Sequence, residues 1–385
     1  MSPVPAFGHD AYLIFGSKES AFDTWTAPTN GKKLRMLKWG VEPSIGAIPD
    51  MTLHGQLSPL APVEGGSFWQ GTFSVPLNLD GLLELFRAAM GGYTAGSVIE
   101  ASARDHTFRE ATSATAIVEL LNSHSIEIAW GNIPVGKIHR LTGVKLLGFT
   151  IKATAGNGND GLVTVEFSLW ARRLDHNAAA GWDPTTSGVT TPTIRRVPFY
   201  HPWLFRDGAT IAPRNARIRS FDVGYMPPHD SERFYLGSKY PDEPIRSDFL
   251  KPTWQITQEL NEPSHLVVKD AFSTGVLRLI CQEQGSPIAT HTSASCTPQN
   301  GNTITRGAGS FVTDGWVVGD HVDPSANGID IPAGCYVTAV VALTLTVAGV
   351  TTLGSSQTET GGVRREIELR TPSAKLKSVS YPVES

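Results

Sequence analysis

One four-residue pattern occurs twice in this chain, and it constrains the possible fold more than any other feature of the sequence. The tetrads WQGT at residues 69–72 and WQIT at residues 254–257 lie 254 − 69 = 185 residues apart. Each tetrad lies in a strand-like segment that leads into a short amphipathic segment with helical spacing. Because the context repeats together with the tetrad, the sequence predicts two copies of one unit made of a sheet and a helix.

The segment after each tetrad predicts one short helix. In the first, Asp80 is expected to cap the helix, and Gly91 and Gly92 are expected to end it. Its apolar stripe consists of Leu82, Leu83, Phe86, Ala89 and Met90. In the second, Pro263 suits the first turn and Gly275 is expected to end the helix. The apolar residues of the second helix are Leu266, Val267, Ala271 and Phe272.

Most of the remaining chain predicts short strands separated by turns, because it contains 38 Gly and 26 Pro with frequent Thr, Ser and Val. The clearest case is a hairpin of residues 144–155 and 162–173, joined by the turn sequence GNGNDG. In its second strand, Leu162, Thr164, Glu166, Ser168 and Trp170 alternate with Val163, Val165, Phe167 and Leu169. This period of two predicts one buried face, and the fold class is mainly β.

Residues 290–362 form a module of different character between the predicted strands 275–284 and 365–383. Arg306 is its one basic residue, and its net charge of −4 equals that of the whole chain. Its five acidic residues are Asp314, Asp320, Asp323, Asp330 and Glu359. Because an insertion with close ends folds without disturbing its host, the sequence predicts a small all-β domain on the outside of the protein.

Residues 176–200 carry Gly, Thr and Pro without periodicity and predict an extended linker or arm. Two roles are open for the aromatic residues in and after this segment: a platform for stacking sugars, or anchors against a neighbouring barrel or subunit. We favour the anchors. The residues concerned are Trp182, Phe199, Tyr200, Trp203 and Phe205.

The charge and cysteine content exclude several classes of protein. A net charge of −4 without a clustered basic face is unlike a duplex-binding protein. Cys281, Cys296 and Cys335 show no metal or disulfide spacing, and we expect buried thiols in a reducing compartment. The N-terminus lacks the pattern of a secretion signal, and no apolar run reaches the ~18 residues of a membrane span. We therefore expect a soluble cytosolic product.

The motifs of common enzymes are absent, including HExxH, GxSxG, the Walker loop and a GxGxxG that opens a helix. The glycine-rich segment 307–315 leads into a strand, which indicates a turn rather than a phosphate cradle. For Asp320, His321 and Asp323, a solvated turn is favoured over a cation site. Asp242 and Glu243 between prolines indicate a polar loop. The sequence thus predicts no catalytic, cofactor-binding or metal-ligating residue, and no enzyme.

The order of these segments resembles that of the major tail tube proteins of long-tailed, siphovirus-like bacteriophages. In the first half the resemblance lies in AYLIFGSKESAFDT, GSFWQGTFSVPLNLDGLLELFRAAMGG, HSIEIAWGN and the hairpin of residues 139–173. In the second half it lies in NARIRSFDVGYM, LKPTWQITQEL and IELRTPSAKLKSVSYPV. The segment 301–322 is similar to a small all-β insertion found in several such proteins.

This resemblance implies two tandem tail-tube domains, each a β-sandwich or barrel with one short flanking helix. The boundaries it implies are an N-terminal arm at 1–30, a first domain at 31–175 and a linker or arm at 176–205. The second domain comprises 206–289 and 363–385, and the inserted external domain occupies 290–362.

The resemblance also implies a function. Copies of such a protein join their sheets into rings with a continuous inner barrel, and the rings stack into a tube through which DNA is ejected. Two domains per chain imply a trimeric ring with pseudo-sixfold symmetry, with a hexamer as the alternative. Expected partners are further copies, the tape measure, terminator and baseplate proteins, and DNA in transient passage. Stable membrane association is not expected, and assembly is expected in the host cytoplasm before incorporation into the virion.

Other functions stay open at this point. The β-rich insertion and the aromatic residues fit a tail-associated protein that binds glycans on the host surface. A baseplate or terminator protein with the tail-tube fold is a second alternative, and a β-sandwich carbohydrate enzyme is a third. The host, the strands that line the channel, a ligand of the insertion and the contractility of the tail are not indicated by the sequence.

Overall fold

The structure is a computed structural model in which most of the chain is described. The described residues are 11–29, 31–48, 62–94, 98–100, 103–104, 106–110, 123–129, 138–156, 161–176, 187–193, 196–199, 202–206, 209–211, 218–248, 252–258, 274–282, 290–318, 320–323, 331, 335–362 and 366–375.

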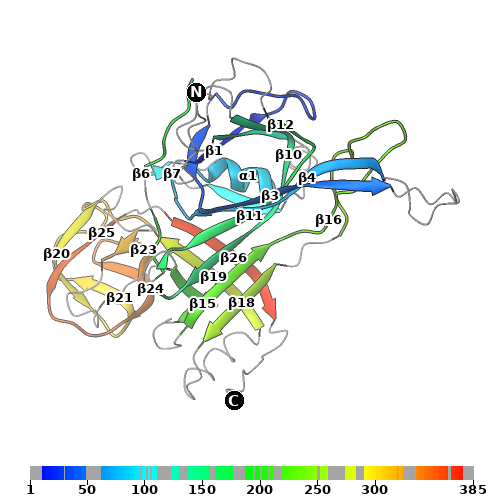
Figure 1. The fold of residues 1–385 in the computed structure, drawn as a ribbon. Helices are drawn as coiled ribbons and strands as arrows, with labels where there is room; N and C mark the ends of the chain where they lie inside the picture. Colours follow the sequence, from blue (N-terminus) through cyan, green and yellow to red (C-terminus); the bar gives the residue numbers. More distant parts are fainter. Residues whose placement is uncertain are drawn as a thin grey trace, which may run out of the picture.

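The described part of the chain is mainly β, as predicted, with one short helix (Figure 1). The largest sheet has ten strands. Its main path runs through β2 (Lys32–Arg35), β1 (Tyr12–Lys18), β9 (His124–Ala129), β10 (Ile138–Thr154), β11 (Thr164–Ala171), β4 (Val63–Pro76) and β3 (Lys38–Ile48). Three more strands join this path, namely β12 (Arg173–His176), β15 (Ile218–Tyr225) and β18 (Thr253–Gln258).

Strand β10 connects two layers of this sheet because its two halves have different partners. Its first half, up to Val144, pairs with β9 and β12. Its second half pairs with β11 on one side and β15 on the other. The chain bends where the partners change, since the β9 pairing shifts register between Leu141 and Val144.

A separate four-stranded sheet follows the same order of elements as one end of the large sheet. Its order is β14 (Ala209–Ile211), β13 (Pro202–Arg206), β19 (Thr274–Gln282) and β26 (Glu366–Lys375). We call it the second strand set. It corresponds in chain order and in pairing to β2-β1-β9-β10, which we call the first strand set.

Between β19 and β26 the chain forms a closed barrel with its own hydrophobic core around Phe311 and Trp316. Figure 1 shows this barrel beside the large sheet, in yellow and orange. Its strands are, in order, β20 (His291–Pro298), β21 (Gly301–Arg306), β24 (Thr344–Thr351), β23 (Tyr336–Val341), β22 (His321–Val322) and β25 (Gln357–Gly362). Closure pairs every strand on both sides and removes exposed edges.

Three two-stranded sheets complete the described structure. They are β5 (Gly91–Thr94) with β8 (Thr107–Glu110), β6 (Val98–Glu100) with β7 (Ala103–Arg104), and β16 (His229–Asp230) with β17 (Ile245–Arg246).

The predicted hairpin is confirmed as β10 and β11, which pair in antiparallel register from Lys145↔Trp170 to Lys152↔Thr164. The predicted alternation is confirmed too, since Val163, Val165, Phe167 and Leu169 are buried. One outward position departs from the pattern. Trp170 is fully buried because Phe22 and Phe68 stack against it, so the polar side of the strand is covered at that end.

The first predicted helix is present as α1 (Leu83–Met90), and Gly91 ends it with a φ of 76° as predicted. The predicted cap by Asp80 is wrong. The N-cap residue is Leu82, without a side-chain cap, because the Asp80 carboxylate accepts the Thr193 N–H instead. Leu85, which the predicted stripe omitted, is fully buried together with Phe86 and Ala89 on the face toward the sheet. The second predicted helix lies outside the described residues, and Gly275 lies in β19.

Candidate assembly surfaces

Six neighbouring strands, β3-β4-β11-β10-β15-β18, present a broad polar face. Alternation places Phe73, Phe149, Phe167 and Val223 in the core, so the intervening residues point to the opposite side. We define the polar face as Lys38, Glu42, Gln70, Thr72, Ser74, Thr150, Lys152, Thr164, Glu166, Ser168, Ser220, Asp222, Thr253, Gln255 and Thr257. All of these side chains are exposed or half-buried.

The polar face carries few charges, and they nearly cancel. They are Lys38 and Lys152 against Glu42, Glu166 and Asp222. Lys152 lies 3.3 Å from Glu166 and is paired in register with Asp222, so its positive charge is partly neutralised. A surface of this kind has hydroxyl and amide groups but no basic excess to hold phosphates.

Two hairpins contribute to this face with matching registers. In the first hairpin, β3 and β4, Glu42 is paired with Gln70. In the second hairpin, β15 and β18, Asp222 is paired with Gln255. Both glutamines come from the repeated WQxT tetrads, and each is opposite a carboxylate. The repeat found in the sequence thus corresponds to a repeated pairing in the structure.

The two hairpins are joined into one sheet where β15 pairs with the second half of β10. We call this junction the seam, and it runs from Phe149↔Tyr225 to Thr154↔Ser220. The Phe149 and Tyr225 rings stack across it with centroids 5.4 Å apart. Phe149, Ile151, Val223 and Tyr225 are buried in the same core, so the seam combines strand pairing with apolar packing.

A segment between β15 and β18, residues 231–247, contacts β10 and β4 beside the seam through two ion pairs. Glu243 forms an ion pair with Lys145, whose ammonium group is almost fully buried in β10. Burial lowers the pKa of Lys145, and the Glu243 carboxylate opposes that shift. Earlier in the segment, Lys239 lies 2.7 Å from Glu64 of β4.

Strand β3 forms an edge of the large sheet, since β4 is its one strand partner in the part of the chain that the structure describes. Figure 1 shows β3 and β4 projecting from the body of the molecule. Along this projection Ile45 and Ile48 are each 59% exposed, and Val63 is 64% exposed. An open strand edge flanked by exposed aliphatic side chains is a site for strand addition.

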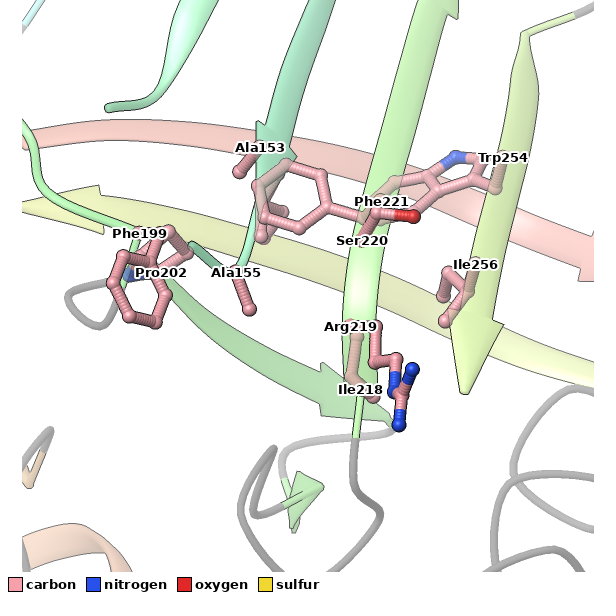
Figure 2. A pocket seen from close by; sticks show the side chains of 11 residues that line it. Ala153, Ala155, Phe199, Pro202, Ile218, Arg219, Ser220, Phe221, Trp254 and Ile256 are labelled. Carbon is pink, nitrogen blue, oxygen red and sulfur yellow. The ribbon is translucent and has the colours of Figure 1, made fainter. Parts of the chain in front are cut away.

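An apolar pocket lies between the second hairpin and the second strand set (Figure 2). Phe221, Trp254 and Ile256 line one side and Pro202 lies opposite them in Figure 2, and Leu279 is also part of the lining. Arg219 is the charged residue in the lining, and the cavity measures about 50 Å³. The pocket therefore offers apolar contact without the convergent polar groups of a catalytic site.

The buried Glu19 is a structural residue of the first strand set. Its carboxylate accepts hydrogen bonds from Ser123 Oγ at 2.5 Å, Ser125 Oγ at 2.8 Å and the backbone N–H groups of Gly143 and Asp23 at 3.0 Å. Burial raises the pKa of Glu19, while these hydrogen bonds oppose the shift. The carboxylate ties the end of β1 to β9 and β10 and is shielded from any substrate.

In the barrel, the predicted solvated turn at Asp320, His321 and Asp323 is wrong for the first two residues. Asp320 is fully buried, accepts the Val317 N–H at 2.8 Å and lies 3.7 Å from His291. His321 is also buried, because it lies in β22 inside the barrel. Asp323 accepts a hydrogen bond from Thr360. Within the described ranges, no group of three or more metal-ligating residues is present.

The sequence missed the role of Glu243, which was expected to belong to a solvated polar loop. Its partner Lys145 is 98 residues away, and no local pattern signals such a pair. Of the linker aromatics, Phe199 lines the pocket, Trp203 and Phe205 lie in β13, and Trp182 and Tyr200 lie outside the described residues. All three cysteines are buried free thiols, as expected. Burial raises the pKa of Cys296 to about 11 and that of Cys335 to about 12.

Comparison with known proteins adds one positive finding. Residues 8–259 match the family described as phage tail tube protein. No curated protein matches the sequence. Among the described residues, no helix has the length and apolar character needed to cross a membrane.

Proposed function

Because the chain belongs to the phage tail tube protein family, and so is a structural component of the virion tail, we propose that it self-assembles into rings. The rings stack into a tube of the siphovirus-like kind, and DNA passes through this tube into the host. The protein has no catalytic activity. It assembles in the host cytoplasm with the tape measure, terminator and baseplate proteins of the same tail.

The observation that carries this proposal is the seam between β10 and β15. It joins two hairpins of the same register into one continuous sheet with one buried and one polar face. A sheet that grows by adding like hairpins side by side closes only when it returns to its first strand. The open edge of β3 supports closure through further copies of the chain.

We propose two tail-tube domains in each chain, 31–175 and 206–289 with 363–385, connected by the linker 176–205. The corresponding order of the two strand sets and the matching hairpins support two such units, with β1 belonging to the first and β13 to the second. Six units then surround the channel when three chains form a ring, which predicts a trimer with pseudo-sixfold symmetry.

The polar face is the proposed lining of the channel. Its hydroxyl and amide side chains remain hydrated, and its charges nearly cancel. A basic lining would bind phosphates through release of counterions and would slow the passage of DNA. The lining proposed here offers no such binding energy.

The barrel at 290–362 is the proposed external domain. Its separate core and its closed strand order support a fold that does not depend on the ring. Within the predicted N-terminal arm at 1–30, Tyr12–Lys18 form β1 of the large sheet and so do not belong to an arm. The linker is proposed as an arm between rings.

Negative-stain electron microscopy of the purified full chain, combined with analytical ultracentrifugation, tests this proposal. We expect rings or hollow tubes and, under dissociating conditions, a trimeric species. A stable monomer would contradict self-assembly. Discrete oligomers that bind glycans on an array, without tubes, would favour a host-surface binding protein instead.

A further inference from the structure

We propose that the folded chain joins the side chains of Lys145 and Glu243 by an amide bond. The Lys145 ammonium group donates a hydrogen bond to Oε1 of Glu243, so the two reacting groups are already in contact. The two residues are 98 positions apart in the sequence, and the bond connects β10 covalently to the segment 231–247 beside the seam. The proposal goes beyond self-assembly and does not depend on it.

The two reacting groups are held in place from both sides. The Lys145 side chain is 7% exposed, and that of Glu243 is 22% exposed. Arg233 donates a hydrogen bond of 2.7 Å to the backbone carbonyl of Glu243. The Asp242 N–H donates one of 2.8 Å to the backbone carbonyl of Arg233. Groups that are oriented in this way react as if at very high concentration, with effective molarities of ~10⁵ M or more.

Aromatic rings surround the contact and keep water away from it. Lys145 is paired in register with Trp170 of β11, so both side chains lie on the same side of the sheet. Phe22 and Phe68 stack against Trp170, which is fully buried. Phe234 lies against Phe68, with ring centroids 6.3 Å apart. Because water is a product of amide formation, a site that excludes water favours the bond and protects it from hydrolysis.

Trp170 also provides a hydrogen-bond donor beside the contact. Its Nε1–H has no hydrogen-bond partner among the residues that the structure describes, although the side chain is fully buried. Such a buried donor is costly unless it has an acceptor. When the amine attacks Cδ of Glu243, the carbonyl oxygen gains negative charge, and a nearby donor stabilises the resulting intermediate. We assign this role to the indole N–H of Trp170.

The reaction needs no oxidant, reductant or other co-reactant. The ion pair supplies an ammonium group and a carboxylate, which are converted to an amide and water. The Lys145 nitrogen attacks Cδ of Glu243 with its lone pair, so a C–N bond forms. A C–O bond of Glu243 breaks, and that oxygen leaves as water with two protons from the ammonium group.

A second buried carboxylate, that of Glu19, assists the loss of the first proton from Lys145. Burial lowers the pKa of Lys145, which favours the neutral amine that the attack requires. Burial raises the pKa of Glu19, which makes its carboxylate a stronger base. Glu19 accepts the N–H of Gly143, two residues before Lys145 in β10, and its charge acts on Lys145. We assign Glu19 as the acceptor of this proton and its donor to the leaving oxygen.

Intact-mass spectrometry of the full chain, denatured after purification, tests the proposal. The unmodified chain is expected to be lighter than its sequence by one water molecule, and a digest is expected to contain one branched peptide with Lys145 and Glu243. Lys145→Arg keeps the positive charge but cannot form the amide, so it is expected to have the full sequence mass. Lys239→Arg is the matched control, because Lys239 lies 2.7 Å from Glu64 but both side chains are exposed. This control is expected to lose one water like the unmodified chain.

A time course after cell-free synthesis tests the role of Glu19. Glu19→Gln is expected to lose water ~100-fold more slowly than the unmodified chain, because a proton acceptor is removed. Circular dichroism shows whether each variant is folded. A folded Glu19→Gln chain that reacts at the unmodified rate would exclude Glu19 from the reaction.

A folded, unmodified chain that keeps its full sequence mass after prolonged incubation at neutral pH would overturn the amide bond and leave an ion pair. A loss of water that persists in Lys145→Arg would overturn it as well, because the reaction would then lie elsewhere. If Lys145→Arg does not fold, Glu243→Ala and the branched peptide provide the same test. Tube formation is measured separately by electron microscopy, so failure of the bond and failure of the proposed function are distinguishable.

Discussion

Among the described strands, the small barrel has no free strand edge, whereas the large sheet has an open edge at β3. In the barrel, β20 to β25 close on themselves around a separate core, and each strand has two neighbours. In the large sheet, β3 keeps one open edge with exposed aliphatic residues beside it. A barrel of this kind leaves no free strand edge, whereas the open edge of β3 fits the proposed completion of the sheet by another chain. The difference supports the proposal that chains assemble through the sheet and that the barrel lies outside the ring contacts.

The largest expected effect is a loss of stability in the core of the large sheet that leaves the core of the barrel unchanged. Phe167 is fully buried and packs against Phe73, Phe86 and Phe149 at ring distances of 5.5 to 6.0 Å. Phe167→Ala is expected to lower the free energy of unfolding of the sheet by ~4 kcal/mol. Calorimetry should show a shifted sheet transition and an unchanged barrel transition. Trp316→Ala is the matched variant for the barrel, and a shift of both transitions by either variant would show that the cores are coupled.

The next largest effect is expected at the ion pair of Lys145 and Glu243 beside the seam. Glu243→Ala leaves the Lys145 ammonium group buried without its partner, which is expected to cost ~3 kcal/mol of stability. Glu64→Ala breaks the exposed pair with Lys239 and is expected to leave the free energy of unfolding nearly unchanged, because solvent screens that pair. Denaturant unfolding measures both. Equal costs would show that the Lys145 pair does not hold the seam.

A pH effect of similar size is expected in the sheet. Burial lowers the pKa of His124 to about 4 from its usual 6.5. A depressed pKa gives stability that is present above pH 6.5 and is lost as the pH falls toward 4, by ~3 kcal/mol in total. Unfolding measured from pH 7 to 4 should therefore weaken the sheet, and His124→Gln should flatten this dependence. An unchanged slope in the variant would exclude His124 as its source.

A smaller effect concerns the turn between β10 and β11. A Cβ atom at Gly161 would lie 2.7 Å from the Gly156 carbonyl oxygen. Gly161→Val is therefore expected to destabilise the hairpin by ~2 kcal/mol and to slow assembly of the sheet. Gly307→Val is the control, because open space surrounds its added Cβ atom. Light scattering measures the rate of assembly. Equal rates for the two variants would show that the turn at Gly161 does not affect assembly.

The smallest expected effect is that of removing the barrel. Deletion of residues 290–362 with a short Gly-Ser connection should leave tubes of unchanged inner diameter in electron microscopy. Loss of assembly would show that the barrel takes part in ring contacts and is not a decoration.

Local patterns predicted those parts of the fold that depend on neighbouring residues. Alternation and the glycine-rich turn predicted the β10–β11 hairpin, and Gly91 marked the end of α1. The cap failed because Asp80 has a competing partner at Thr193, more than a hundred residues away. That contact is tertiary, so no local pattern contains it.

The sequence predicted that the chain contains two similar units, but it did not predict which residues join them. The WQxT repeat indicated two like units, and the structure shows where their hairpins meet. The pairing of Ile151 with Val223 and the contact of Lys145 with Glu243 depend on chain geometry between distant residues. Neither has a signal in composition or periodicity.

Cryo-electron microscopy of the assembled tube, at a resolution that separates strands, tests the central claim most directly. We predict that a strand of a neighbouring chain pairs with residues 40–45 of β3, so that the polar face continues from one chain to the next. A tube in which the β3 edge faces solvent would contradict the account.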